Sequence, residues 1–445
     1  MTRRNYLVAG LCFLLFQIYG QESLTFKEAV SIGLKNNVTL KQQENLLISS
    51  NIAKQSSLLA LGPTVSINGE AARTDGNSFN QQEGTVVNGV ADAVGAQISA
   101  SMPLFRGLST LNNYRQSVSQ NDAQVQFVKR TKQDVIRNVA NQFLTCLLDQ
   151  RLVSIRERSL EYQKKQFEQI KEQVSAGSRA EADLLNQEFQ VKNAELLLLR
   201  AKTTLRNDKT TLAQTLMIDP YSEFTLVDPS WDINILSSEQ LNVELLYETA
   251  KSQRADYIRT KANERASELN YTSSKGSYFP NVSLFANYGS FYNYIHDRPN
   301  RTFEQQFTQD NTRLRYGVTF SIPIYGGFTN RAQVVQNKML YQNAQLESEN
   351  IEMTIKNDVL RAMQNYQDAI LSYESAESQL RASEISYNLE NERYTLGVSD
   401  IVALTLSLQN YTQAQADFES AKYTLMFQRL LLNYATGTLK FEDIP

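Results

Sequence analysis

Two short stretches, SMPLFRGLST (101–110) and FSIPIYGGFTN (320–330), decide how this chain is organised. Each alternates apolar with small polar residues and then continues into a proline, an apolar residue, an aromatic residue and glycine. Pro103 and Pro323 lie 220 positions apart. The same phrase used twice at this distance indicates an internal duplication, in which one structural unit occurs twice.

Other residue pairs follow nearly the same offset. Gly177 and Gly397, which interrupt long proline-free segments, are also 220 positions apart, and Pro63 and Pro280 are 217 apart. Two units of this length are not the short stacked repeats of a solenoid. We therefore expect two large repeats of similar structure.

The N-terminus is typical of a secretory signal peptide. Two arginines precede an apolar core at 7–16 that is too short to span a bilayer, and Gly20 suits cleavage before Gln21. Removal of residues 1–20 would leave Cys146 as the only cysteine, which excludes an internal disulfide.

The mature chain is then expected to divide into a first repeat at 21–241 and a second at 242–445. Each repeat would contain a short helix, two strands and a pair of long helices. The segment 217–241 holds two prolines and the only tryptophan, so we interpret it as a packed collar between the repeats.

Alternation of apolar and polar residues predicts the strands. In the last one, Leu314 and Tyr316 share one face while Arg315 lies on the other, and Phe285 is an exception to the pattern in its strand. Each predicted strand has roughly ten residues, the length at which a tilted strand crosses a bilayer. The four strands are predicted at about 63–73, 95–105, 280–290 and 312–325.

This pattern has two readings. A soluble antiparallel sheet with one wet face alternates in the same way. In a membrane, four strands cannot close a barrel and an open edge cannot face lipid, so several chains would have to share one barrel. The polar segments 72–94 and 292–311 would then be loops outside the cell.

Helices are expected on both sides of the strands. Thr25 and Glu28 have the spacing of a capping box at a helix start, and Asn242 can cap the matching helix of the second repeat. After each proline phrase, apolar residues recur at spacings of three, four or seven, which is typical of a coiled-coil seam. The segment 107–173 would form a rod of roughly 100 Å, with shorter return helices at 182–216 and 401–432.

Composition disfavours several function classes. The net charge is −3, so no basic excess indicates a nucleic-acid partner. His296 is the only histidine, and the chain has no HExxH, CxxC, Walker loop or GxSxG motif. We therefore expect no enzyme, and no catalytic, cofactor-binding or metal-binding residue.

In order and in duplicate, these motifs make the chain resemble the TolC-type outer-membrane efflux proteins, the outer membrane factor family. The resemblance covers essentially the whole mature chain. It rests on MPLFRG with IPIYGG, AGSRAEADLL with LGVSDIVALT, and TFKEAVSIGLKNN with NVELLYETAKSQRADY.

The resemblance implies an α+β membrane protein that forms a homotrimer. Each protomer would give four strands to a twelve-strand barrel in the outer-membrane lipid, continued by a long periplasmic helical barrel with an equatorial collar. The implied function is a passive exit duct of a tripartite efflux or type I secretion system. An inner-membrane pump would drive export through a periplasmic adaptor.

The resemblance also assigns roles to residues. The duplicated phrases would mark the places where a strand leaves the membrane and becomes a helix. These strand-to-helix junctions are Pro103, Phe105 and Gly107 in the first repeat and Pro323, Tyr325, Gly326 and Gly327 in the second.

The breaks at Gly177 and Gly397 can be helix C-caps, and the resemblance places them at the periplasmic tip where the adaptor docks. Ser178, Val398 and Ser399 would flank that contact.

Asp183 and Tyr394 match positions that close the periplasmic entrance in this family, although a solvated helix start and seam packing explain them equally well. Glu181 and Asp400 would add negative charge that favours cations at this mouth. The chain departs from the family's usual gate residues at Ser399, Ala403 and Leu406.

One alternative is a periplasmic coiled-coil adaptor or scaffold without channel activity, with the strands in a soluble domain. Another is a surface-binding protein whose barrel only anchors it. The sequence names neither the cargo nor the pump and adaptor.

Overall fold

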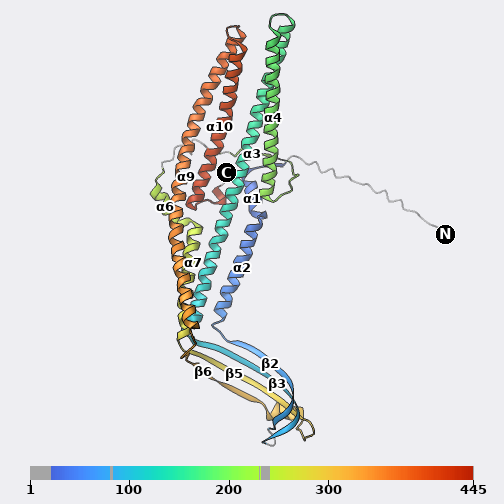
Figure 1. Ribbon diagram of the computed structural model, residues 1–445, viewed down its shortest axis with the longest axis vertical. Coiled ribbons are helices and arrows are strands. Elements are labelled where there is room, and N and C mark those ends of the chain that lie inside the picture. Colours follow the sequence, from blue (N-terminus) through green and yellow to red (C-terminus); the bar gives the residue numbers. More distant parts are fainter. Residues whose placement is uncertain (1–21, 81–83, 230, 232–240, 444–445) are drawn as a thin grey trace, which may run out of the picture.

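The computed structural model describes residues 22–80, 84–229, 231 and 241–443. A curved sheet lies at one end of an elongated molecule, and two helical hairpins end at the other (Figure 1). The expected signal peptide at 1–20 and part of the expected collar segment, at 230 and 232–240, lie outside the described residues.

The helices show the duplication directly. Helices α3 and α9 each have 67 residues, and α4 and α10 each have 36. Both pairs start 220 positions apart, which confirms the internal duplication. The long helices are α3 (Ser109–Ser175), α4 (Glu181–Leu216), α9 (Thr329–Thr395) and α10 (Ile401–Thr436). The shorter ones are α1 (Phe26–Asn36), α2 (Val38–Leu59), α6 (Val243–Gln253) and α7 (Ala255–Ser274).

Both predicted helix caps are confirmed. The hydroxyl of Thr25 accepts a hydrogen bond from the backbone N–H of Glu28 at 3.3 Å, and the Glu28 carboxylate accepts one from the N–H of Thr25 at 2.9 Å. The side chain of Asn242 accepts from the N–H groups of Glu244 and Leu245. In the first helix of each repeat, a side chain therefore satisfies the first free backbone donors.

The four long strands form one antiparallel sheet in the order β2-β3-β5-β6. The two repeats meet in this sheet where β3 pairs with β5. The strands are β2 (Thr64–Asn80), β3 (Thr85–Arg106), β5 (Asn281–Ile295) and β6 (Arg313–Ser321).

Three strands are longer than the expected ten residues. β2 has 17 residues, β3 has 22 and β5 has 15. The segment 72–94, expected to be a loop, is mostly the far end of a hairpin whose register continues to the pair Asn80 and Thr85. The prediction failed because this hairpin end is rich in Gly and Asn and so lacks the alternating apolar signal.

Each face of the sheet has its own chemistry. Val65, Ala100, Ala286 and Tyr316 are neighbours in one cross-strand row, which belongs to the apolar face. The adjacent row, which lies on the other face, is Ser66, Ser99, Asn287 and Arg315. Several large apolar side chains of the first face are more than half exposed in the single chain, among them Ile67, Tyr316 and Phe320.

The largest core lies around the middle of the rods. Phe26, Phe143, Leu212 and Leu216 are completely buried there or nearly so. A short parallel pair, β1 (Glu22–Leu24) with β4 (Phe224–Leu226), borders this core. Cys146 is fully buried in the same cluster and packs among its apolar side chains.

None of the described helices combines the length and the apolar character that a membrane-spanning helix needs.

Candidate functional site at the junctions and tips of the rods

The two proline-containing motifs, at 101–110 and 320–330, lie where the sheet meets the helices. In the second repeat β6 ends at Ser321, two residues before Pro323. In the first repeat the strand pairing does not end at the proline. The register of β3 shifts between Pro103 and Phe105 and then continues to Arg106. β3 is an inner strand with a neighbour on each side, so its ladder resumes after a bulge, whereas β6 is an edge strand.

Gly107 makes the first junction possible. Its φ is +58°, and a Cβ there would lie 2.5 Å from the carbonyl oxygen of Gly276. Only glycine combines this conformation with so close an approach. Gly327 also has a positive φ, +64°, but nothing lies within 4 Å of the place where its Cβ would be, and Gly326 has no such φ.

Aromatic side chains surround both junctions. Phe105 is 38% exposed and Tyr325 is 90% exposed, and Tyr278, Phe279 and Phe328 nearby are all more than half exposed. Aromatic side chains in such numbers are typical of the level where a membrane protein meets the lipid headgroups.

Both glycine breaks at the far ends of the rods have the same turn. Gly177 has φ +72° and Gly397 has φ +71°. The N–H of Ser178 donates to the carbonyl of Gln173 at 2.9 Å, which is the six-residue bond of a Schellman motif. The N–H of Val398 makes the equivalent bond at 2.9 Å. The tips are therefore two copies of one turn, with Val398 67% exposed.

A contact between the two hairpins lies beside these turns. The guanidinium carbon of Arg179 lies 5.1 Å from the centroid of the Tyr394 ring, within reach of a cation–π interaction. Burial raises the pKa of Tyr394 above its ordinary value, and the charge of Asp183 adds to this increase. The nearby guanidinium of Arg179 lowers the same pKa and so offsets part of the increase. Asp183 affects Tyr394 through its charge alone. Within the described residues, no hydrogen bond joins the side chains of Asp183 and Tyr394.

The other acidic residues of the tip have different positions. Glu181 is exposed in the first turn of α4. Asp400 caps α10 by accepting a hydrogen bond from the N–H of Ala403 at 2.8 Å. The hydroxyl of Ser399 donates to the carboxylate of Glu390, which also pairs with Arg393 at 3.1 Å.

A second contact joins α3 to α9 farther from the tip. The rings of Tyr162 and Tyr387 meet edge to face with their centroids 5.8 Å apart. The hydroxyl of Tyr162 donates to the side chain of Asn391 at 3.3 Å. Tyr387 also stacks on Tyr411 of α10 at 5.5 Å. Two aromatic contacts, at different heights, therefore hold the hairpins of one protomer together.

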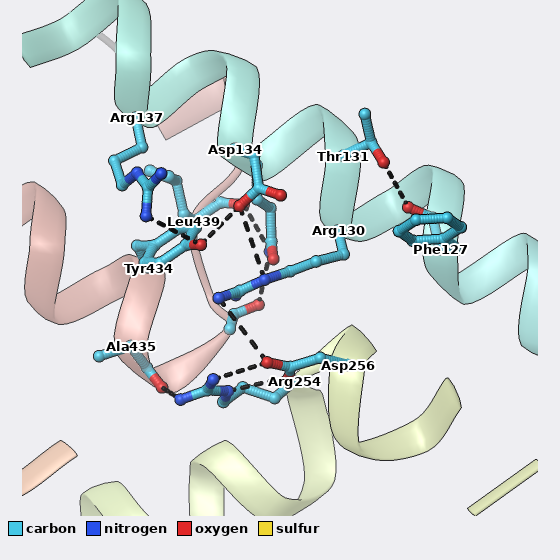
Figure 2. Close-up of polar contacts among 12 residues, drawn as sticks. Phe127, Arg130, Thr131, Asp134, Arg137, Arg254, Asp256, Tyr434, Ala435 and Leu439 are labelled. Carbon is cyan, nitrogen blue, oxygen red and sulfur yellow. Dashed lines mark hydrogen bonds and ion pairs between the residues drawn. The ribbon is translucent and has the colours of Figure 1, made fainter. Parts of the chain in front are cut away.

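A polar network crosses the middle of the rods (Figure 2). Arg254, whose side chain is 2% exposed, makes a two-pronged ion pair with Asp256 and also pairs with Asp358. Its Nη1 donates to the carbonyl of Ala435 at 3.3 Å. One guanidinium thus links the start of α7 to α9 and to the end of α10.

Arg130 extends the network to α3. Its guanidinium lies 3.9 Å from the Tyr434 ring centroid and 3.7 Å from carboxylate oxygens of both Asp134 and Asp256. The hydroxyl of Tyr434 donates to Asp134 and accepts from Arg137 (Figure 2). Burial, together with the bond to Asp134, raises the pKa of Tyr434 to about 12.

Sequence reasoning missed Arg179 and Arg254. Arg254 stands 217 positions after Asn37, the junction of α1 and α2, so the repeat offset marks its position but not its partners. Arg179 stands two residues after Gly177, and this short distance from the tip glycine is the only sequence signal that could have marked it as a site residue.

These features appear together in known proteins. A sequence profile described as "Outer membrane efflux protein" matches residues 32–216 and 246–438, one match in each repeat. The chain belongs to the outer membrane efflux protein family. It is 21% identical over 371 residues to outer membrane protein TolC of Salmonella enteritidis, covering 81% of this chain and 74% of that protein.

Solved structures of outer-membrane proteins have a similar fold. The fold is similar to that of the outer membrane protein VceC of Vibrio cholerae, with a TM-score of 0.79, 14% identity and coverage of 93% of this chain and 96% of that one. It is also similar to that of the CmeC outer membrane channel of Campylobacter jejuni, with a TM-score of 0.78, 17% identity and coverage of 93% and 85%. The protein therefore has the efflux-channel fold and lies in the outer membrane with its rods in the periplasm. Its family consists of channel proteins and not of enzymes.

Proposed function

We propose that three copies of this chain form the outer-membrane exit duct of a tripartite efflux or type I secretion system. The duct is passive, and a periplasmic adaptor docked to an inner-membrane pump opens it. The observation that carries the proposal is an open sheet with one apolar face, joined to rods that end in matched tips.

The sheet edges require partner strands. β2 and β6 are the outer strands, so each has a row of backbone groups without a partner strand. In lipid, each unsatisfied group costs several kcal/mol. Pairing β6 of one copy with β2 of the next continues the antiparallel order and satisfies both edges.

The number of copies follows from the strand count. Two copies would give about eight strands, whose interior side chains fill. Three copies give twelve strands and leave room for a water-filled lumen, and three is also what the family resemblance implies.

Exposed stripes on the helices fit the same arrangement. Leu346, Met353 and Leu360 of α9 recur every seven residues and are 62%, 62% and 40% exposed. Leu185 and Phe189 of α4, one turn apart, are 60% and 66% exposed. Apolar residues at heptad spacing need a partner helix, and neighbouring copies around the rod axis would supply it.

The tips would serve docking and gating. The exposed turns at Gly177, Ser178, Gly397, Val398 and Ser399 form a repeated surface to which a second protein can bind. The Arg179–Tyr394 and Tyr162–Tyr387 contacts would hold the hairpins in the closed state. Adaptor binding at the turns would separate them.

Acidic residues would shape the mouth. Glu181 is exposed in the first turn of α4, near Asp183, and Asp400 is the N-cap of the matching helix α10 in the second repeat. We propose that they bias the entrance toward cations, as rings of carboxylates do. Unchanged ion selectivity in a protein with both Asp400→Asn and Glu181→Gln would contradict this assignment.

Conductance across a planar lipid bilayer tests the duct. Purified mature protein should give discrete current steps after insertion. A periplasmic scaffold, with its strands in a soluble domain, would give none. Complete absence of current at all voltages, from protein shown to be folded and inserted, would contradict the proposed function.

A further inference from the structure

The polar face of the sheet, which carries the row of Ser66, Ser99, Asn287 and Arg315, has an excess of positive charge. Arg313 and Arg315 of β6 alternate with Leu314 and Tyr316, so their side chains lie on the face opposite the apolar one. Arg106 belongs to the same face, because it pairs with Asn281 after the bulge in β3. Moving arginine to a lipid-facing position would cost about 2–4 kcal/mol at the bilayer midplane, so these side chains belong in water.

Glu70 is the acidic residue of that face in the described strands. It lies in β2, on the same face as Ser66 and Asn68, and is separated from β6 by β3 and β5. Within the part of the chain that the structure describes, no ion pair forms between Glu70 and either arginine of β6. Three arginines against one glutamate leave two positive charges per protomer, even where β2 of a neighbouring copy brings its own Glu70 beside β6.

The two arginines of β6 line a hollow. A cavity of about 540 Å³ opens over this face, lined by Glu70, Gln97, Asn287, Arg313 and Arg315 among others. Gly289 also lines the hollow and pairs directly with Arg313, and a Cβ there would lie 2.7 Å from the carbonyl oxygen of Ala96 in β3. The wall of the hollow therefore offers two guanidinium groups and several amides to a solute.

Phe285, the exception in the alternation of its strand, has a role here. Its cross-strand partner is Gly317, and a Cβ at Gly317 would lie 3.1 Å from the Phe285 ring. The guanidinium of Arg315 lies 5.5 Å from the same ring centroid. An aromatic ring thus supports the arginine on the polar face, which fixes its charge near the wall and away from the edge of the sheet.

We propose that Arg313 and Arg315 make the barrel lumen an anion-attracting segment, so that the duct favours cargo bearing carboxylate or phosphate groups. This inference rests on the proposed channel function. It concerns a different part of the duct from the acidic mouth at the tips, and the two segments act in series.

The test is the reversal potential in a KCl gradient across a planar bilayer. Neutralising both arginines, R313Q with R315Q, should lower the chloride-to-potassium permeability ratio by about twofold or more. Each single variant should give a smaller decrease. R313K with R315K keeps the charge and should keep the wild-type ratio. R301Q removes an arginine that pairs with Asp310 in the loop before β6, and should change little.

A second readout separates the barrel from the mouth. Inorganic triphosphate added on the extracellular side should reduce the wild-type current, and a several-fold higher concentration should be needed in the double glutamine variant. Equal permeability ratios and equal triphosphate sensitivity in both proteins would overturn the inference while leaving the duct intact. A wild-type protein that inserts but passes no current would overturn the duct and this inference with it.

Discussion

Arg254 donates a hydrogen bond from Nη1 to the backbone carbonyl oxygen of Ala435, 3.3 Å away and 181 positions later in the chain. The second repeat uses this bond to attach the start of α7 to the last turn of α10. In the first repeat Asn36 makes a comparable connection, donating to the carbonyl of Leu216 at 3.2 Å. The two repeats thus share the position of this connection between helices but make it with different side chains, an arginine in one and an asparagine in the other.

Replacing Arg254 by alanine should destabilise the folded protein by about 3 kcal/mol, because the partly buried Asp256 would lose its two-pronged ion pair and keep only the longer 3.7 Å contact with Arg130. Thermal unfolding of the detergent-solubilised protein, followed by helical circular dichroism, measures the loss. Arg265→Ala is the matched control, since Arg265 is 57% exposed and pairs with Glu268 on the same helix. Surface pairs of this kind contribute less than about 1 kcal/mol. Similar losses in the two variants would contradict the role of Arg254.

Asp149 should make stability depend on pH. Burial of the Asp149 side chain, and secondly its hydrogen bond with Asp208, raises the pKa of Asp149 from 3.8 to about 7. The Oδ2 atom of Asp149 has no hydrogen-bond partner in the described part of the chain. Between about pH 4 and pH 7 the folded state therefore binds more protons at this site than the unfolded state. The free energy of unfolding should fall as pH rises through this window.

The variant Asp149→Asn cannot ionise, so this component of the pH dependence should disappear. Melting temperatures of the two proteins, measured across the window, give the comparison. The variant should gain stability over wild type as pH rises. Parallel curves would show that Asp149 titrates normally in the folded protein.

The contact between the hairpins predicts a gating effect. Arg179→Gln removes the cation above the Tyr394 ring, an interaction worth about 0.5–1 kcal/mol at an exposed site. A change of 1 kcal/mol alters a two-state equilibrium about fivefold, so mean single-channel conductance or open probability should rise by up to that factor. Lys192→Gln is a control, because Lys192 forms an exposed pair with Glu195 on the same helix. Identical currents from wild type and Arg179→Gln would remove this contact from the gate.

The two junction glycines should differ in their tolerance of a side chain. Gly107→Ala places a methyl group 2.5 Å from the backbone of Gly276, so the strand must move away from the helix. Gly327→Ala meets only the left-handed backbone penalty of about 1–2 kcal/mol. The yield of folded protein in the outer membrane should therefore fall much further for Gly107→Ala. Equal yields would mean that the junction of the first repeat is not as close-packed as described.

The sequence predicted the rods well because their signals are local. The long helix expected at 107–173 is observed at Ser109–Ser175, bounded by Gly107 and Gly177, whose positive φ values end regular structure. The duplication then placed α9 and α10 by offset. Glycine at a turn and apolar spacing along a helix depend only on neighbouring residues, so they can be read without the fold.

Prediction from the sequence failed for features that depend on partner residues far away in the chain. The far halves of β2 and β3 are held by each other and by β5, not by apolar alternation. Arg254 reads as one charged residue among many until α9 and α10 bring Asp358 and the carbonyl of Ala435 to it. The contact of Arg179 with Tyr394 joins two hairpins in the same way, so no local pattern could reveal it.

The most direct test of the central claim is the native mass of the mature protein extracted from outer membranes in mild detergent, corrected for bound detergent. The account predicts three chains in one particle that requires detergent to stay in solution. A monomer recovered without detergent would contradict it, because the apolar face of the sheet and both of its open edges would then be stable in water.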